Sequence, residues 1–336
     1  MNKSFFCLAL GLVLGLSLFS RQVVAYAAPK ASPAAESLGE CVAEVSSRRI
    51  LFEKDGERNL PMASTTKILT AIIVIEDCDL NDTVVIPQAA QGVEGSSVYL
   101  RAGEEYTVED LLYGLMLRSG NDCAVALALH HSGSIEGFAQ VMNQRAVSMG
   151  AEDSLFRNPH GLEAEGHHTT ARDLALIAAY AMENPTFQQI VSTKYYEKQN
   201  WQNKNKMLWN FEGAVGVKTG FTMHAGRCLV TSAEREGMKL VCVVLNSPQM
   251  YERTAELLEG AFSKYKMKEL CDSTKPYEGY RISGSFSYPL TKDESDKISY
   301  QTELISPPPE RQGDYAGIMR IFLENSLIFS QNLYIM

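Results

Sequence analysis

Runs of apolar residues divide the chain into predicted helices and strands. The longest continuous run, residues 68–75, is apolar at nearly every position and predicts a helix buried on all sides. Residues 250–264 carry apolar side chains at helical spacing between charges, which predicts an amphipathic helix. Runs that alternate or are wholly apolar predict an antiparallel sheet from segments 41–45, 49–52, 215–220, 228–233 and 240–245.

A polar stretch, residues 118–122, interrupts the apolar pattern between two predicted helices. A start similar to a capping box predicts the first helix over residues 107–117, and the second begins at residue 123. Ser119 and Asn121 lie in the interruption. One interpretation is a turn in which glycine ends one helix and an amide caps the next. The other is a loop that presents a hydroxyl and an amide to a cleft.

The N-terminus predicts export. Lys3 precedes an apolar segment, residues 5–19, which is too short to cross a membrane comfortably. Small residues at positions 25 and 27 predict cleavage after Ala27, and an uncleaved anchor stays open as the alternative. Residues 28–36 are rich in Ala, Pro and Ser and predict a flexible leader.

The C-terminal part has a different pattern. From about residue 271 helical periodicity is absent, and short strand-like runs alternate with proline and glycine, which predicts a small all-β domain. The predicted organisation is a signal peptide over residues 1–27, a leader over residues 28–36, a large domain over residues 37–270 and a β-rich C-terminal domain over residues 271–336.

Composition excludes several classes of protein. A net charge of −9 over 336 residues argues against nucleic acid as the main partner. The seven cysteines form no C-x-x-C pair, so we expect neither a metal site nor a cofactor. Disulfides among the cysteines that follow the signal segment stay open.

The buried helix predicted at residues 68–75 begins next to a serine and a lysine. Ser64 and Lys67 are three residues apart, which places both side chains on one face of a helix. Serine is a weak nucleophile that needs a base within hydrogen-bond reach. A lysine can be that base when burial or a second cation lowers its pKa. Taken alone, this pattern is also compatible with a polar first helical turn in which Ser64 is a cap.

Two further polar elements follow in a fixed order. Ser119 and Asn121 form S-x-N, and Lys218-Thr219-Gly220 forms K-T-G at the end of a predicted strand. The three elements S-x-x-K, S-x-N and K-T-G together are a known motif set of β-lactamases and penicillin-binding proteins.

The chain resembles low-molecular-mass penicillin-binding proteins, specifically serine-type D-alanyl-D-alanine carboxypeptidases. The resemblance covers about residues 40–262 and is carried by the stretches 60–67, 118–122, 158–162 and 216–222. It implies an α/β (α+β) fold of the β-lactamase and penicillin-binding transpeptidase type. In that fold an antiparallel sheet packs against a helical cluster, and a small all-β domain follows.

The resemblance also implies catalytic roles. Ser64 would attack the carbonyl between two D-alanines, and a neutral Lys67 would take its proton. Ser119 would relay the proton to the leaving amine, and Asn121 would orient Lys67 and the substrate amide. The backbone N–H groups of Ser64 and Phe221 would form the oxyanion hole.

Substrate binding is implied at the K-T-G element. Lys218 and Thr219 would hold the terminal carboxylate of the substrate, and Gly220 would let a ligand approach the backbone. The family often supplies an additional arginine after the third strand. Arg253 is the candidate, although Met250 also fits that register.

These roles imply a partner and a location. The substrate would be the pentapeptide stem of peptidoglycan, and β-lactams would trap Ser64. The enzyme would be exported, to the outer face of the cytoplasmic membrane, the cell wall space or the periplasm. Peripheral association with the membrane stays open.

Two other functions compete with the carboxypeptidase. A class A-type β-lactamase would need an E-x-x-L-N loop, to which Glu152 with Leu155 comes nearest without the asparagine. A non-catalytic peptidoglycan-binding domain would tolerate loss of motif residues, yet all of them are present. The motifs do not separate carboxypeptidase, endopeptidase and transpeptidase activities.

Overall fold

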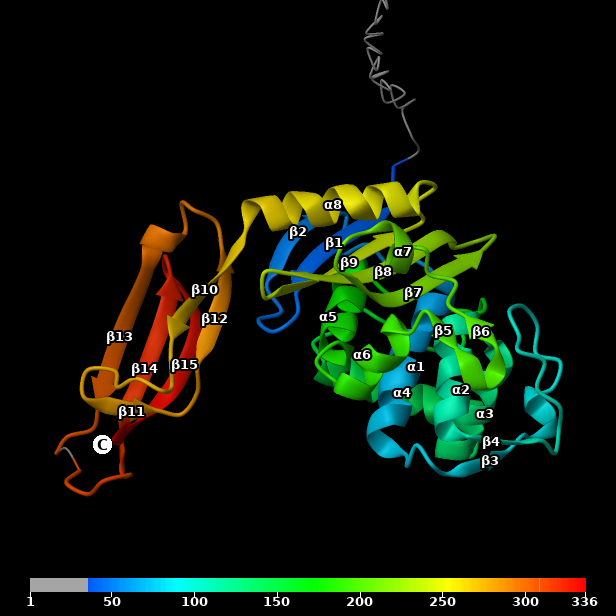
Figure 1. Ribbon diagram of the computed structural model, residues 1–336, viewed down its shortest axis with the longest axis horizontal. Coiled ribbons are helices and arrows are strands. Elements are labelled where there is room, and N and C mark those ends of the chain that lie inside the picture. The colour runs from blue at the N-terminus through cyan, green and yellow to red at the C-terminus, as the bar shows by residue number, and fades with distance from the viewer. Residues whose placement is uncertain (1–35, 308) are drawn as a thin grey trace, which may run out of the picture. The chain divides into compact units, whose positions relative to one another are not determined.

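A five-stranded antiparallel sheet in the order β2-β1-β9-β8-β7 organises the larger part of the fold (Figure 1). The computed structural model describes residues 36–307 and 309–336, so the predicted signal peptide and nearly all of the leader lie outside the described residues. The strands of the sheet are β1 (Gly39–Glu44), β2 (Ile50–Lys54), β7 (Ala214–Thr222), β8 (Gly226–Arg235) and β9 (Met238–Leu245).

The strand order leaves β7 at one edge of this sheet. Strand β7 pairs with β8 on one side, so the other side of its backbone carries N–H and C=O groups that no strand of the sheet covers. A tight turn joins β8 to β9, with positive φ values at Glu236 and Gly237. The predicted sheet is therefore confirmed, and its free edge belongs to the strand that carries K-T-G.

Helices cover both faces of the sheet (Figure 1). Helix α8 packs on β8 and β9, and α7 contributes Met207 to the same buried cluster. Helices α5 and α6 pack against the sheet from the other face, beside α1, α2, α3 and α4. The helices are α1 (Lys67–Asp77), α2 (Val108–Tyr113), α3 (Asn121–Ser132), α4 (Ile135–Ser148), α5 (Ala171–Ala181), α6 (Pro185–Ser192), α7 (Met207–Asn210) and α8 (Met250–Lys264).

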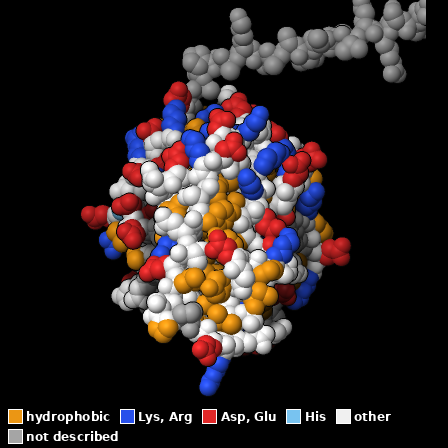
Figure 2. Space-filling view, turned by 90° about the vertical axis from the view of Figure 1, so that its left-hand side faces the viewer, with side chains coloured by type: hydrophobic (Ala, Val, Ile, Leu, Met, Phe, Trp, Pro, Cys, Tyr) orange, Lys and Arg blue, Asp and Glu red, His pale blue; other side chains and the backbone are white. Residues whose placement is uncertain are grey.

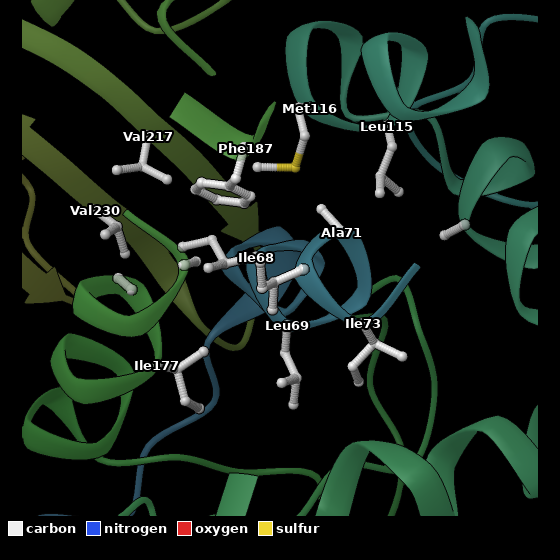
Figure 3. Close-up of a cluster of buried hydrophobic side chains, with 14 of the residues drawn as sticks. Ile68, Leu69, Ala71, Ile73, Leu115, Met116, Ile177, Phe187, Val217 and Val230 are labelled. Carbon is white, nitrogen blue, oxygen red and sulfur yellow. The ribbon is translucent and has the colours of Figure 1, made fainter. Parts of the chain in front are cut away.

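Helix α1 is the centre of the helical cluster, as its continuous apolar run predicts. Figure 3 shows its side chains meeting residues from several elements, among them Phe187 of α6 and Val217 of β7. Ile68 and Leu69 are fully buried. Burying a side chain of this size stabilises the fold by about 1.5–3 kcal/mol, so the position of α1 is fixed firmly by packing.

A turn and a short helix lead into the S-x-N element. The Thr107 side chain accepts a hydrogen bond from the Asp110 backbone N–H and caps α2, as predicted. A π-helical turn, Gly114–Arg118, follows α2 and ends at Ser119. Two small two-stranded antiparallel sheets lie beside this region, one of β3 (Thr83–Val85) and β4 (Glu105–Thr107), the other of β5 (Tyr195–Tyr196) and β6 (Trp201–Gln202).

The C-terminal residues form β structure, as predicted. Two strands pair with each other, and four more form a sheet in the order β11-β15-β14-β13. The exact limit of this region stays a prediction. The strands are β10 (Lys266–Cys271), β11 (Tyr280–Ile282), β12 (Phe286–Leu290), β13 (Ile298–Leu304), β14 (Tyr315–Leu323) and β15 (Ser326–Ile335).

These strands enclose a small core of their own. Met319, Ile321 and Leu333 are its fully buried members. Some large apolar side chains of this region remain exposed, Leu327 among them, and Figure 2 shows a band of hydrophobic side chains between charged ones on one side of the molecule.

Six cysteines lie in the described residues, and all six are free thiols there. Within residues 36–307 and 309–336, no helix combines the length and apolarity that a membrane crossing requires.

Candidate active site

Ser64 lies in a 3₁₀ turn, Ala63–Thr66, directly before α1. Ala63 has φ of 48°, a left-handed conformation that non-glycine residues rarely adopt. The hydroxyl of Thr65 donates to the Met62 carbonyl at 2.6 Å, and this bond helps to hold the strained turn. Such strain persists where the surrounding structure over-determines it, which is common at functional sites.

The Lys67 side-chain nitrogen lies within hydrogen-bond reach of Ser64 and of two carbonyl oxygens. Its Nζ lies 2.9 Å from Ser64 Oγ, 2.7 Å from Asn121 Oδ1 and 2.6 Å from the backbone oxygen of His160. Lys67 has no exposed surface. The three contacts fix its amine between the serine and two groups that can only accept hydrogen bonds.

Burial and, to a smaller extent, the charge of Lys218 hold the pKa of Lys67 well below its ordinary value. A neutral amine has two N–H groups and one lone pair. The N–H groups then donate to Asn121 and to the His160 carbonyl, which leaves the lone pair for the Ser64 hydroxyl proton. This arrangement fits a general base that receives a proton from Ser64.

Asn121 is the first residue of α3, and both ends of its side-chain amide are fixed. Its Oδ1 accepts from Lys67, and its Nδ2 donates to the Glu94 carbonyl at 2.6 Å. The neighbouring Asp122 is fully buried and accepts hydrogen bonds from the segment that contains Val98. The segment after Glu94 is therefore fixed against the S-x-N element, which acts as a loop at a cleft rather than only as a helix cap.

Ser119 has φ of 65°, which turns the chain sharply between the π-helical turn and α3. Its side chain lines the same cleft as Ser64. Both serines of the motif set thus reach one cavity.

The K-T-G strand packs directly against the Ser64 turn. A Cβ atom at Gly220 would lie 3.0 Å from the Met62 carbonyl and 3.1 Å from the Ser64 nitrogen. A side chain here would crowd the Ser64 turn, so glycine allows β7 to approach it closely. The approach brings Thr219 and Phe221, on either side of Gly220, to the cleft.

Lys218 is almost completely buried, and its Nζ donates to the Thr219 carbonyl at 2.9 Å. Burial, and secondarily the charge of Lys204, lower the pKa of Lys218 to about 7. The charge of Lys218 opposes protonation of Lys67, so the second cation that helps to lower the pKa of the base is present.

The cleft has a volume of about 350 Å³. Two cations, Lys204 and Arg227, lie in its wall, to which none of the described residues contributes a carboxylate. Its lining consists of Ser64, Ser96, Ser119, Lys204, Thr219, Gly220, Phe221, Arg227, Met250 and Tyr251.

Arg253 is not brought to this cleft. Its guanidinium forms a bidentate ion pair with the buried carboxylate of Glu40, at 2.8 and 2.7 Å, and contacts Glu256. One turn earlier on α8, Met250 lines the cleft instead. The geometry thus corrects the expectation for Arg253, because the helical register points its side chain to the sheet and to Glu40.

The turn formed by residues 158–162 packs against the turn that carries Ser64. Asn158 Oδ1 accepts from the Gly161 N–H at 2.7 Å, and a Cβ atom at Gly161 would clash with the Ala63 carbonyl. Burial and the charge of Lys67 lower the pKa of His160 to about 3, so its ring is neutral. His160 contributes its backbone oxygen to the site, as the acceptor of a hydrogen bond from Lys67.

Sequence reasoning missed Lys204, Arg227 and the carbonyl of His160. Arg227 lies on the strand that pairs with K-T-G, but only the register of that pairing brings it to the cleft. Lys204 and the His160 carbonyl carry no local signal, because only the folded chain brings them to the cleft.

Comparison with known proteins agrees with this geometry. A profile of the D-alanyl-D-alanine carboxypeptidase family matches residues 26–249, which is well over half of the chain. The chain belongs to this family. The predicted resemblance, the fold class and the serine carboxypeptidase assignment are confirmed by this match and by the relatives below.

Individual relatives cover different shares of the chain. D-alanyl-D-alanine carboxypeptidase DacF of Bacillus subtilis is 33% identical over 250 residues, which are 70% of this chain and 64% of DacF. The solved structure of penicillin-binding protein 5 from Haemophilus influenzae is 27% identical, with a TM-score of 0.75, and covers 91% of this chain and 98% of its own. The solved structure of a mutant Streptomyces K15 DD-transpeptidase is 31% identical, with a TM-score of 0.65. The match covers 69% of this chain and 100% of the transpeptidase chain.

Proposed function

We propose that this chain removes the terminal D-alanine from peptidoglycan stem peptides through an acyl-enzyme on Ser64. The observation that carries the proposal is the buried amine of Lys67, placed 2.9 Å from Ser64 Oγ between two acceptor oxygens. Family membership supplies the substrate class. The same arrangement argues against a non-catalytic peptidoglycan-binding domain, which would have no use for a buried amine beside Ser64.

Acylation begins when Lys67 takes the proton of Ser64 and Oγ attacks the carbonyl carbon of the penultimate D-alanine. The tetrahedral oxyanion lies toward the backbone N–H groups of Ser64 and Phe221, on the two segments that Gly220 brings together. Each donor of this kind contributes about 3 kcal/mol to the transition state. The proton then passes from Lys67 through Ser119 to the leaving amine, and water later hydrolyses the ester.

The terminal carboxylate of the substrate requires cations beside the K-T-G element. Lys218 and Thr219 provide a charge and a hydroxyl, as the sequence predicts. Arg227 takes the place that was expected of Arg253, because it lines the cleft and pairs with Phe221 across the β7–β8 ladder. Charge-assisted hydrogen bonds from an arginine are among the strongest available to a carboxylate.

The free edge of β7 gives the substrate backbone a place to bind. An extended peptide can add to such an edge through main-chain hydrogen bonds. The stem would thus lie along Thr219–Phe221 with its scissile carbonyl at Ser64. β-Lactams, which mimic this dipeptide terminus, would acylate the same serine.

Export and domain organisation belong to the same proposal. Family members act on the cell wall outside the cytoplasm, and a cleavable signal over residues 1–27 would bring this chain there. The catalytic domain would comprise residues 37–270 and the β-rich domain residues 271–336.

The experiment uses the mature protein, a pentapeptide ending in D-alanyl-D-alanine, and benzylpenicillin. We expect release of D-alanine and a persistent penicillin adduct in the intact mass, both absent in Ser64→Ala. Ser263→Ala, on the exposed face of α8, is the matched control and should behave as wild type. Rapid penicillin turnover without an adduct would support a β-lactamase, and a folded protein with neither adduct nor turnover would support a binding domain.

A further inference from the structure

A second cavity, of about 320 Å³, is lined by three aromatic rings, and we call it the aromatic hollow. Tyr99 is 85% exposed and Tyr195 is 47% exposed, whereas Trp201 is partly buried against the core of the helical cluster. The polar members of the wall that bear on ligand binding are Arg118, Asn200 and Gln202. Exposed rings that gather at one hollow indicate a surface made to be covered.

Tyr99 is held in its exposed position against a local cost. Its φ of 68° is left-handed, which tyrosine rarely adopts. The buried carboxylate of Asp122 accepts from the backbone N–H groups of Val98 and Leu100, on both sides of Tyr99, at 3.1 Å each. The Tyr99 N–H donates to Ser97 Oγ at 2.8 Å. Strain that the surroundings enforce in this way is common at ligand sites, and here it turns an aromatic ring to the surface.

Strands β5 and β6 carry the other rings of the hollow, and they are fixed as well (Figure 1). Tyr195 pairs with Gln202 across the two strands, and the Arg118 guanidinium donates to the Gln202 carbonyl at 3.1 Å. A Cβ atom at Gly114 would lie 3.1 Å from the Trp201 ring, so this ring packs closely on the π-helical turn. The rings are therefore placed before a ligand arrives, which lowers the entropic cost of binding.

The lining favours a neutral ligand with an apolar face and polar edges. Among the described residues, no Asp or Glu lines the hollow, and its cation, Arg118, is already bonded to a carbonyl. Asn200 and Gln202 carry amides, which both donate and accept hydrogen bonds. A wholly apolar ligand would cover these groups without pairing them, and that costs free energy. A pyranose sugar meets both requirements, because its C–H face is apolar and its hydroxyl groups lie at the ring edge.

The aromatic hollow and the catalytic cleft lie along one surface. Ser97 lines the hollow, and Ser96, the residue before it, lines the cleft. A further cavity of about 500 Å³ shares Arg118 and Gln202 with the hollow and Lys204 with the cleft. A long polymer that is held at the cleft therefore meets the hollow along the same surface.

We infer that the aromatic hollow is a saccharide-binding site for the glycan of peptidoglycan, with sugar rings stacked on Tyr99, Tyr195 and Trp201. The site goes beyond the proposed function, because binding there needs no chemistry at Ser64. Only the choice of a cell wall glycan rests on the proposed function, which puts this chain at peptidoglycan. A bound glycan would keep the enzyme on the wall and raise the effective concentration of stem peptides at the cleft.

The test measures binding of a neutral sugar chain to the mature Ser64→Ala protein, so that catalysis plays no part. The probe is a tetramer of β-1,4-linked N-acetylglucosamine, followed by isothermal titration calorimetry. We expect a Kd of about 1 mM or lower. Because the probe has no charge, its Kd should be the same at low salt and near 1 M salt. A short peptide of glutamates, titrated in the same way, tests for an anionic ligand instead.

Further substitutions in the Ser64→Ala background separate ring stacking from folding. Tyr99→Gly should weaken sugar binding about tenfold. Its melting temperature should not fall, because glycine adopts a φ of 68° without strain. Tyr99→Phe keeps the ring and should keep the affinity, whereas Tyr195→Ala should lose affinity as Tyr99→Gly does. Tyr315→Ala, at a similarly exposed tyrosine of β14, is the matched control and should bind the sugar as its parent does.

Two outcomes would overturn the inference: no measurable sugar binding by Ser64→Ala, or equal affinity in Tyr99→Gly. Binding of the glutamate peptide in place of the sugar, lost near 1 M salt, would also overturn it, since the cations rather than the rings would then hold the ligand. Failure of the proposed function would look different. The wild type would then show neither D-alanine release nor a penicillin adduct, while sugar binding persisted.

Discussion

The region around α1 and the C-terminal sheet bury different kinds of residue. In the first region Lys67, Lys218 and Asp122 are almost completely removed from water. In the described part of residues 266–336, Gln331 is the one buried polar side chain, and the rest of the buried set is apolar. Burying a charge opposes folding, whereas burying apolar surface favours it. The first region therefore loses stability where it places its chemistry, whereas apolar packing stabilises the second.

The largest effect should follow loss of the nucleophile. Ser64→Ala removes the only group that can form the acyl-enzyme in our mechanism, so D-alanine release should fall by at least about 10⁴-fold. The melting temperature should stay within a few degrees of wild type, because the substitution keeps the turn. Residual activity near wild type would place the nucleophile elsewhere. Stopped D-alanine assays and thermal melts provide the two readouts.

Lys218→Met should separate stability from activity. Because the pKa of Lys218 is near 7 in the fold and about 10.5 unfolded, the unfolded state binds more protons between these values. Removal of the lysine should therefore increase the free energy of unfolding by more than about 1 kcal/mol at pH 7–8. Activity should fall about 100-fold, since the carboxylate loses a cation and the pKa of Lys67 rises. Urea unfolding of both proteins checks the sign, and a less stable variant would contradict it.

Arg227→Gln and Arg253→Gln form a matched pair. The first should lower kcat/KM about tenfold, mostly through KM, because Arg227 lines the cleft. The second should leave kcat/KM unchanged but destabilise the fold by about 3 kcal/mol, because Glu40 loses its partner while buried. If the catalytic loss appeared in Arg253→Gln instead, Arg253 would bind the substrate carboxylate, as the family resemblance implied.

The pH profile should show a smaller, several-fold effect. Activity requires a neutral Lys67 and a charged Lys218. Above about pH 7 the free enzyme loses the proton of Lys218, so KM should rise and kcat/KM should decline. A bound carboxylate favours the charged lysine, so the alkaline decline in kcat should begin at higher pH than that in kcat/KM. Coincident alkaline limbs would argue against a carboxylate beside Lys218.

The smallest effect on activity should come from the C-terminal core. Met319→Ala removes a fully buried side chain and should destabilise that region by about 2–5 kcal/mol. With Ser64 and Lys67 untouched, kcat for a soluble peptide should equal that of wild type at 25 °C. Differential scanning calorimetry with parallel D-alanine assays tests this, and a proportional loss of kcat would show that the sheet supports the cleft.

Local patterns in the sequence determined much of this protein. The continuous apolar run predicted the buried helix α1, the alternating runs predicted β7, β8 and β9, and helical spacing predicted α8 with its observed bounds. These features depend on neighbours a few residues apart, which a sequence displays directly. The three motifs identified residues that the fold brings together at one cleft. A motif can do this because catalytic chemistry requires particular residue types at its positions.

Tertiary structure alone decided which cations serve the cleft. Arg253 and Arg227 look alike in sequence, but the register of α8 directs Arg253 to Glu40, whereas the β7–β8 pairing places Arg227 in the cleft wall. The backbone oxygen of His160 and the ammonium of Lys204 come from distant segments. Their roles follow from packing between those segments, and side-chain direction across such a distance is set by the whole fold rather than by the residues nearby.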